Sequence, residues 1–351
     1  MKQIRKYQSE AVKVFMDKKQ GIINIPTGSG KTLIAAEIIR QADTKTLWII
    51  DRKELLQQTK KVLHELLEIP IGEISGDLFD IQDITIATVQ SLNSRLFELL
   101  EYLYTISFVC IDEYHKSAAE TYQKVFAKLP NTKYRLGLTA TAQRSDGKTP
   151  ILFSVLGEII VKITTEELVK LGYLVKPEIR FYNLSGCDYF STTYIEDYAN
   201  NIVHNIERNK LIVKLVDKYK DKKILILTKS IPHGKILNKE IPGSAHIHGK
   251  ARNREQNMQD FRDNKIRCMV MTVSIGAEGL DIPDLDIIIN AGANKNDVKS
   301  IQVLGRVLRI FKNKDSALYI DFLDIGRHTR KHSEARIAAF KSEGHEVRVV
   351  E

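Results

Sequence analysis

Residues 26 to 32 read Pro-Thr-Gly-Ser-Gly-Lys-Thr, a combination of side chains suited to holding a phosphate group. Gly28 and Gly30 let the backbone curl so that several N–H groups point at one anion. Lys31 can reach the β- and γ-phosphates of a nucleotide, and the hydroxyl of Thr32 can bind Mg²⁺. We expect the whole loop, including Thr27 and Ser29, to contact the nucleotide. The alternative is a Gly/Ser turn that happens to precede a lysine.

The elements on either side of this loop favour the phosphate interpretation. The apolar run Ile22–Ile25 predicts a buried strand, and residues 33–40 have the pattern of a helix. The N-terminus of that helix adds a partial positive charge where the glycines direct the N–H groups. The general phosphate-loop pattern has a first glycine where this chain has Ile25, so the match to that pattern is incomplete.

A second chemical signal is the acidic pair Asp112-Glu113, which directly follows the apolar run 108–111. In a phosphoryl-transfer site Asp112 would hold Mg²⁺, and Glu113 would orient and deprotonate the attacking water. The alternative is an acidic N-cap for the following helix. Together with the phosphate loop, the pair predicts nucleotide hydrolysis.

The third signal is Gln302, Arg306 and Arg309, whose spacing places them on one helix face. Two arginines on one face can stabilise the transition-state charge on a γ-phosphate as arginine fingers. A solvated charged face is the alternative. Upstream, Gly279 permits close backbone approach, and Asp281 can accept from a ribose or from a finger arginine.

The start of the chain offers a group for the base. Gln8 can bind the N6 and N7 edge of adenine through its amide, and Arg5 or Tyr7 can stack on the ring. Gln8, Ala11, Val12 and Phe15 follow the spacing of one helix face. The alternative for Gln8 is a solvated residue at the start of that helix.

Several residues at the ends of predicted strands or just beyond them, most of them basic or hydroxyl-bearing, suit contacts with the phosphates of a nucleic acid. They can equally be helix caps or solvated residues. The candidates are Arg52, Thr88, Gln90, Thr228, Lys229, His248, Gly249, Arg252 and Thr272.

Apolar runs alternate with helical patterns along the whole chain, which predicts an α/β fold with parallel sheets covered on both faces. The change of character between residues 160 and 178 predicts two domains, residues 1–170 and 171–351. The predicted strands are 46–50, 84–88, 108–111, 134–139, 224–228, 245–247, 268–272, 287–290 and 317–321, and the predicted helices include 54–67, 91–104 and 210–219.

The composition favours a polyanionic partner. The 351 residues carry 53 Lys+Arg against 44 Asp+Glu, a net charge of +9. The three cysteines, Cys110, Cys187 and Cys268, lie far apart and have no zinc-site spacing. Without an apolar N-terminal segment or a run of about 20 apolar residues, we expect a soluble protein in a reducing compartment.

In their order and spacing these motifs resemble the superfamily 2 helicases over nearly the whole chain. The resemblance implies two tandem RecA-like lobes, with ATP and Mg²⁺ bound in the cleft between them and nucleic acid across their tops. The matching elements are Tyr7-Gln8, Pro26–Thr32, Asp51-Arg52, Thr88-Val89-Gln90, Asp112-Glu113-Tyr114-His115, Thr139-Ala140-Thr141, His248-Gly249, Gly276–Pro283 and Gln302–Arg309.

Details of the motifs resemble the DNA-acting branch that contains XPB and the phage branch-migration helicase UvsW. The acidic motif ends in His115, as in DExH proteins, and the run Gly-Leu-Asp-Ile-Pro occupies residues 279–283. The tail, with residues 319–322 and a basic helix that carries His328, Arg330, Lys331 and His332, is similar to that branch too. A solvated C-terminal helix is the alternative for the tail.

The resemblance implies an ATP-dependent DNA helicase or translocase in recombination, repair or replication, acting on single-stranded, forked or branched DNA. We expect a monomer in the cytoplasm of a prokaryotic or phage-infected cell. Three alternatives remain open. They are a double-strand translocase that does not separate strands, an RNA helicase, and a nucleic-acid-binding protein without catalysis.

Overall fold

The computed structural model describes residues 4–51, 53–112, 119–140, 154–184, 191–249, 251, 253–273, 275, 282, 284–295, 304–305, 308, 310–311, 314 and 316–351. The chain forms two compact units, Met1–Ile163 and Thr164–Glu351. The division lies on the N-terminal side of the predicted boundary at residues 170 and 171, so that helix α8 (Thr165–Lys170) belongs to the second unit.

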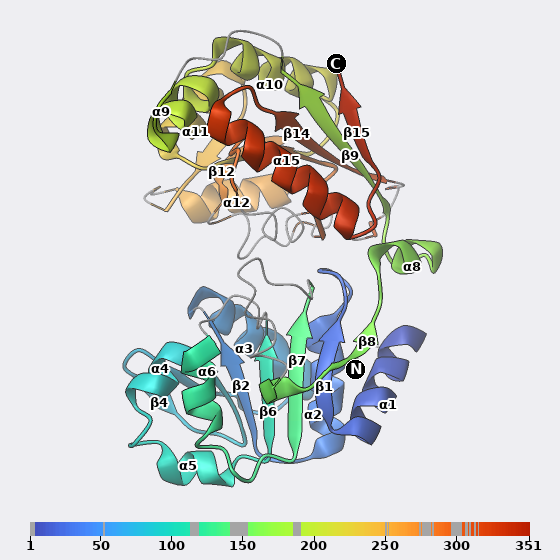
Figure 1. Cartoon of the computed structure of the whole chain (residues 1–351), viewed down its shortest axis with the longest axis vertical. Helices are drawn as coiled ribbons and strands as arrows, with labels where there is room; N and C mark the ends of the chain where they lie inside the picture. The colour runs from blue at the N-terminus through green and yellow to red at the C-terminus, as the bar shows by residue number, and fades with distance from the viewer. Residues whose placement is uncertain are drawn as a thin grey trace. The chain divides into compact units, whose positions relative to one another are not determined.

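Within the described residues, the first unit has an eight-stranded sheet in the order β4-β3-β5-β2-β6-β7-β1-β8 (Figure 1). All of its pairs are parallel except β3 with β4. The strands are β1 Gln20–Asn24, β2 Thr46–Ile50, β3 Gly72–Ser75, β4 Leu78–Asp80, β5 Ile84–Thr88, β6 Phe108–Asp112, β7 Tyr134–Thr139 and β8 Ile159–Lys162.

Helices cover both faces of this sheet because its central strands are apolar on both sides. In β2, Trp48 belongs to one core cluster, while Leu47 and Ile49 belong to the cluster on the opposite face, as the two-residue period of a strand requires. The helices are α1 Lys6–Lys18, α2 Lys31–Ala42, α3 Lys53–Leu67, α4 Val89–Ser94, α5 Leu100–Thr105 and α6 Ala119–Phe126.

The helix predicted over residues 91–104 is wrong in its extent, because the structure has two short helices there. Helix α4 ends at Ser94 and α5 begins at Leu100. The hydroxyl of Ser94 donates to the carbonyl of Ser91 over 3.1 Å. Serine competes in this way with helix continuation, and the apolar periodicity of the segment gave no sign of it.

The second unit has, in its described part, a seven-stranded parallel sheet in the order β11-β12-β10-β13-β14-β9-β15. Its strands are β9 Lys176–Asn183, β10 Ile224–Thr228, β11 Ala245–Ile247, β12 Cys268–Thr272, β13 Ile287–Asn290, β14 Ser316–Leu323 and β15 Val347–Val350. Besides α8, its helices are α9 Tyr194–Tyr198, the π-helix η2 Ala199–Val203, α10 Ile206–Lys218, α11 Ile231–Glu240, α12 Arg254–Arg262 and α15 Arg327–Ser342.

The α/β fold with two parallel-dominated sheets confirms the predicted fold class. Cys110 and Cys268 are buried free thiols, whereas Cys187 lies outside the described residues. No helix in the described part of the chain is both long enough and apolar enough to cross a bilayer.

Candidate functional site

The predicted phosphate loop lies between the carboxyl end of β1 and the start of α2. Gly28 and Gly30 have φ of 86° and 88°, in the left-handed region that side chains disfavour. Ser29 closes a turn, because its hydroxyl donates to the carbonyl of Pro26 over 2.5 Å. The local sequence therefore folds as the glycines predict, into a curled loop that leads directly into a helix.

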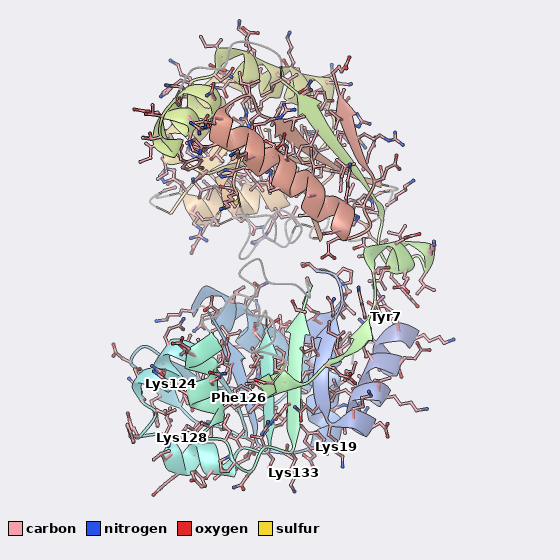
Figure 2. All side chains as sticks on the ribbon, viewed as in Figure 1. Tyr7, Lys19, Lys124, Phe126, Lys128 and Lys133 are labelled. Carbon is pink, nitrogen blue, oxygen red and sulfur yellow. The ribbon has the colours of Figure 1, made fainter. Side chains whose placement is uncertain are left out.

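Helix α1 holds this loop in place through the carbonyl of Ser29. Gln8 Nε2 donates to this oxygen over 2.9 Å, and the hydroxyl of Tyr7 donates to it as well. Both side chains are buried. Figure 2 shows Tyr7 at the end of α1 beside the carboxyl ends of the strands, whereas Lys19 and Lys133 mark the opposite end of this unit. The N-terminal helix thus positions the loop.

This contact bears on the adenine prediction for Gln8. The Gln8 amide donates to Ser29 and accepts from the backbone N–H of Arg5 over 2.8 Å. An adenine edge would compete with both bonds, so adenine recognition by Gln8 stays a prediction. Arg5 is exposed, and its contact with the base stays a prediction too. Tyr7 is 5% exposed, which leaves little of its ring for a base.

The loop has the features of an anion site. Helix α2 begins at Lys31 with no side-chain cap at Gly30, so its N-terminus offers backbone N–H groups to a ligand. The hydroxyl oxygen of Thr27 is buried without a hydrogen-bond partner among the described residues. Lys31 Nζ lies 3.4 Å from the carbonyl of Ile25, beside the loop. These groups fit a bound phosphate.

Asp112 is the last residue of β6, and it is half-buried. Its register partner is Leu138 of β7, and the next residue of β7, Thr139, pairs with Asn24 of β1. The carboxylate therefore lies two strand spacings, about 10 Å, from the strand that leads into the loop. Burial and the charge of Asp112 raise the pKa of the Cys110 thiol well above its usual value, so we assign this cysteine to the core.

Several site predictions lie outside the described residues. They are Arg52, Glu113, Arg252, Gly279, Asp281, Gln302, Arg306 and Arg309.

Two of the predicted nucleic-acid contacts in the first unit have partners within the protein. The hydroxyl of Thr88 caps helix α4, since it accepts from the backbone N–H of Ser91 over 3.3 Å. A helix cap is the alternative to a nucleic-acid contact that the sequence left open for this residue. Gln90 is exposed and its amide lies 3.4 Å from a carboxylate oxygen of Asp51. Gln90 is therefore the accessible one of the two.

In the second unit the predicted contacts divide in the same way. Thr228 and Thr272 pair in register and are buried. Their hydroxyls are therefore not accessible to a nucleic acid at the surface. Lys229 and Gly249 are exposed, and His248 is half-buried with its ring 4.9 Å from that of His246. Lys229, His248 and Gly249 are therefore the accessible predicted contacts among the described residues of this unit, and their role stays a prediction.

Two family profiles match the chain in sequence order. Residues 1–144 match the family described as type III restriction enzyme, res subunit. Residues 207–311 match the helicase conserved C-terminal domain. The chain belongs to the superfamily 2 helicases.

Curated relatives place this helicase close to the XPB branch. The DNA 3'-5' translocase XPB2 of Sulfurisphaera tokodaii is 28% identical, over 95% of this chain and 84% of its own length. The DNA 3'-5' helicase XPB of Kineococcus radiotolerans is 25% identical, over 99% of this chain and 64% of its own length. The chain thus spans less than two thirds of the second relative.

Solved structures show the same fold. A type ISP restriction-modification enzyme, LlaBIII bound to DNA, superposes with a TM-score of 0.74 at 16% identity, over 99% of this chain and 31% of its own. Dbp5 of S. cerevisiae, bound to RNA and ADP BeF3, superposes with a TM-score of 0.68 at 18% identity, over 98% of this chain and 89% of its own.

Sequence reasoning about this helicase missed one functional feature of the loop. The motif pattern placed Tyr7 and Gln8 at the base, while the structure shows both donating to Ser29. A signal was available, because Tyr7 and Gln8 begin the buried face that includes Ala11 and Phe15. Polar side chains on a buried face need partners within the protein.

Proposed function

We propose that the chain is an ATP-dependent DNA helicase or translocase. The observation that supports this most directly is the loop at residues 26–30. Its left-handed glycines, the uncapped helix start and the Thr27 hydroxyl, which has no hydrogen-bond partner in the described part of the chain, fit a triphosphate. The relatives named as DNA translocases and helicases support DNA as the polymer. Their names also include a 3'-5' direction, and we adopt it as the direction of movement along DNA.

In this proposal Lys31 binds the β- and γ-phosphates and Glu113 orients the attacking water. Arg306 and Arg309 stabilise the charge that develops on the γ-phosphate. Gln302, Gly279 and Asp281 contact the nucleotide. Gln8 and Arg5 contact the adenine base.

The proposed metal is Mg²⁺, held by Thr32 and Asp112. No group of three or more His, Cys, Asp or Glu side chains suited to a metal occurs among the described residues. This fits Mg²⁺, which keeps several waters and takes substrate phosphates as ligands together with one or two protein oxygens. When bound, the ion neutralises phosphate charge, and the two oxygen donors of the protein match its preference.

The deciding experiment measures ATP hydrolysis by the purified chain with single-stranded DNA, duplex, fork, four-way junction and RNA. We expect stimulation by DNA and loss of turnover in Lys31→Ala and Glu113→Gln with unchanged thermal stability. Arg309→Ala should lose hydrolysis more than nucleotide binding. Turnover that persists in a clean Glu113→Gln preparation would contradict the role of that residue.

Strand displacement separates the remaining alternatives. A helicase displaces a labelled strand from forked DNA, whereas a double-strand translocase hydrolyses ATP on the same DNA without displacing it. Stimulation by RNA alone would favour the RNA helicase, and no ATP hydrolysis with any polymer would favour a binding protein without catalysis. We expect a monomer by sedimentation.

A further inference from the structure

The edge of the first sheet that ends in β4 differs in charge from the rest of the chain. Between residues 62 and 107 the sequence has eight Asp and Glu residues, and Arg95 is its only Lys or Arg, whereas the whole chain has a net charge of +9. Six strand spacings, about 30 Å, separate β4 from β1 in the sheet order. This edge therefore lies apart from the candidate nucleotide site.

Strand β4 presents both its backbone and its side chains at the surface. In the described part of the chain it has a neighbouring strand on one side only, where Phe79 pairs with Ile74 of β3 (Figure 1). Backbone N–H and C=O groups on its outer side can therefore pair with a further strand. All three residues of β4 are exposed. Extended peptides bind to edges of this kind by adding a strand to the sheet.

Large apolar side chains are exposed along this edge. Leu78 and Phe79 are 51% and 44% exposed, and Ile81, directly after the strand, is 38% exposed. Phe97, three residues after the end of α4, is 83% exposed, more than any other large apolar side chain that the structure describes. Single apolar side chains at the surface are ordinary, whereas a group of them marks an interaction site.

Arg95 connects the two phenylalanines. Its Nη2 donates to the carbonyl of Gly76, in the turn between β3 and β4, over 2.7 Å. Its guanidinium carbon lies 5.8 Å from the centroid of the Phe79 ring. Phe97 follows Arg95 by two residues, at most about 7 Å of chain, so it belongs to the same edge. The arginine thus braces the turn and supports the ring of Phe79.

Exposed carboxylates accompany these apolar side chains in β4, in the residues that flank it and at the start of α5. They are Asp77, Asp80, Asp83, Glu98 and Glu101. None of them forms an ion pair within the described residues, and Asp80 accepts a hydrogen bond from the amide of Gln82 over 3.0 Å. Negative surface charge without a basic partner favours a cationic ligand.

The same charges disfavour two other occupants of the edge. DNA and RNA are polyanions, which the carboxylates repel. A second copy of the chain that paired its own β4 with this one would place the aspartates of both copies on strands about 4.8 Å apart, and like charges across strands destabilise a pairing. Acidic residues protect an edge strand against self-association, but they do not account for the exposed Phe79 and Phe97.

We propose that β4, together with Phe79 and Phe97, is a docking site for an extended basic segment of another protein, which adds to the first sheet as a further strand. Successive side chains of a strand point to opposite faces, so Phe79 lies on one face and Asp80 on the other. A partner strand in which Lys or Arg alternates with β-branched residues would place positive charge beside Asp80 and apolar surface beside Phe79. The site goes beyond the proposed function and does not depend on it.

The experiment measures, by anisotropy at about 100 mM salt, the affinity of the full chain for a fluorescein-labelled octapeptide in which lysine and valine alternate. One control peptide has the same composition with all lysines before all valines, which keeps the charge and removes the alternation. A second has proline in place of a central valine, because proline cannot donate to a ladder of strand hydrogen bonds.

Two variants of the chain test the side chains. The first replaces both phenylalanines, Phe79→Ser with Phe97→Ser, and the second neutralises the aspartates, Asp77→Asn with Asp80→Asn and Asp83→Asn. The matched controls lie in the second unit. Ile195→Ser removes an apolar side chain that is 79% exposed. The triple control neutralises three exposed carboxylates that have no described ion pair, through Asp217→Asn, Asp221→Asn and Glu240→Gln.

We expect both edge variants to bind the alternating peptide roughly tenfold more weakly than the wild type, and both controls to bind it as the wild type does. The block peptide and the proline peptide should bind roughly tenfold more weakly to the wild type as well. Bound alternating peptide should slow the amide hydrogen exchange of residues 77–81.

Several results would overturn this docking site. Equal affinity for the alternating and the block peptide would mean that charge alone attracts the peptide. Wild-type affinity in both edge variants, or unchanged exchange at residues 77–81, would place the peptide elsewhere. A chain that sediments as a dimer, and as a monomer once Phe97 is replaced, would assign the edge to a second copy. If the double variant has a lower melting temperature, Phe97→Ser alone decides.

Discussion

Gln8 donates a hydrogen bond from its side-chain amide to the backbone carbonyl of Ser29, over 2.9 Å and 21 residues of sequence. Tyr7 donates to the same oxygen. The phosphate loop is thus held by two residues of the preceding helix as well as by its own glycines. A change in α1 should therefore reach the nucleotide without touching the loop.

Removal of either donor should weaken ATP binding. We expect Tyr7→Phe and Gln8→Ala each to raise the KM for ATP roughly fivefold, since a hydrogen bond contributes about 1 kcal/mol net. Steady-state ATP hydrolysis measures the effect. Gln41→Ala, which removes an exposed amide of α2 bonded only to Glu37 among the described residues, is the control. A KM unchanged in both variants would mean that the loop keeps its shape without α1.

Gly30→Ala should impair the loop more than backbone strain alone predicts. Its φ of 88° is unfavourable for alanine, and the new Cβ would lie 2.5 Å from Gln8 Nε2, so the amide must leave Ser29. Gly344→Ala is the matched control, because φ there is 82° with no atom within 4 Å of a Cβ. Both variants should lose about 1–2 kcal/mol of stability to strain. Only Gly30→Ala should also lose affinity for a fluorescent ATP analogue, and equal affinities would refute the contact.

The second unit should depend on its buried ion pair. Arg336 donates to both carboxylate oxygens of Asp321 over 2.8 Å, and both side chains are fully buried. Asp321→Ala would remove both of these hydrogen bonds from the buried guanidinium and leave it only Asp324 among the described carboxylates, 3.8 Å away and also paired with Arg208. This variant should reduce the free energy of unfolding by about 3–5 kcal/mol. Urea denaturation measures the loss. The exposed pair Arg330–Glu334 is the control, and Glu334→Ala should change stability by less than about 1 kcal/mol.

Acid should destabilise the second unit through His233. Burial lowers the pKa of this histidine to about 3 from 6.5, so the unfolded chain binds a proton that the folded chain excludes. Stability is complete above pH 6.5 and is lost as the pH falls toward 3, by up to about 1.4 kcal/mol per pH unit. His233→Gln, which can keep a contact with Asn209, should flatten this dependence in urea titrations. An unchanged slope would assign the acid sensitivity to other groups, with His246 the next candidate, because its pKa is lowered to about 4.

The central strands were predictable from sequence. The strands at 46–50, 84–88, 134–139, 224–228 and 268–272 have the predicted bounds, because strands buried on both faces are continuous apolar runs. Strands β3, β4, β8, β9 and β15 were missed. In β8 and β15 the residues are half-buried or exposed, and β9 begins Lys-Pro and carries several polar residues, so their apolar pattern is weak.

For the candidate site, the residue types in the primary structure were sufficient to predict a curled phosphate loop and the acidic residue that ends β6. Both are local consequences of glycine dihedral angles and of where an apolar run stops. The chain order could not reveal that Gln8 and Tyr7 converge on Ser29, that Thr228 and Thr272 are buried, or that Arg95 meets Phe79. Those contacts join residues far apart in sequence, and the order in which the strands pair decides which of them become neighbours.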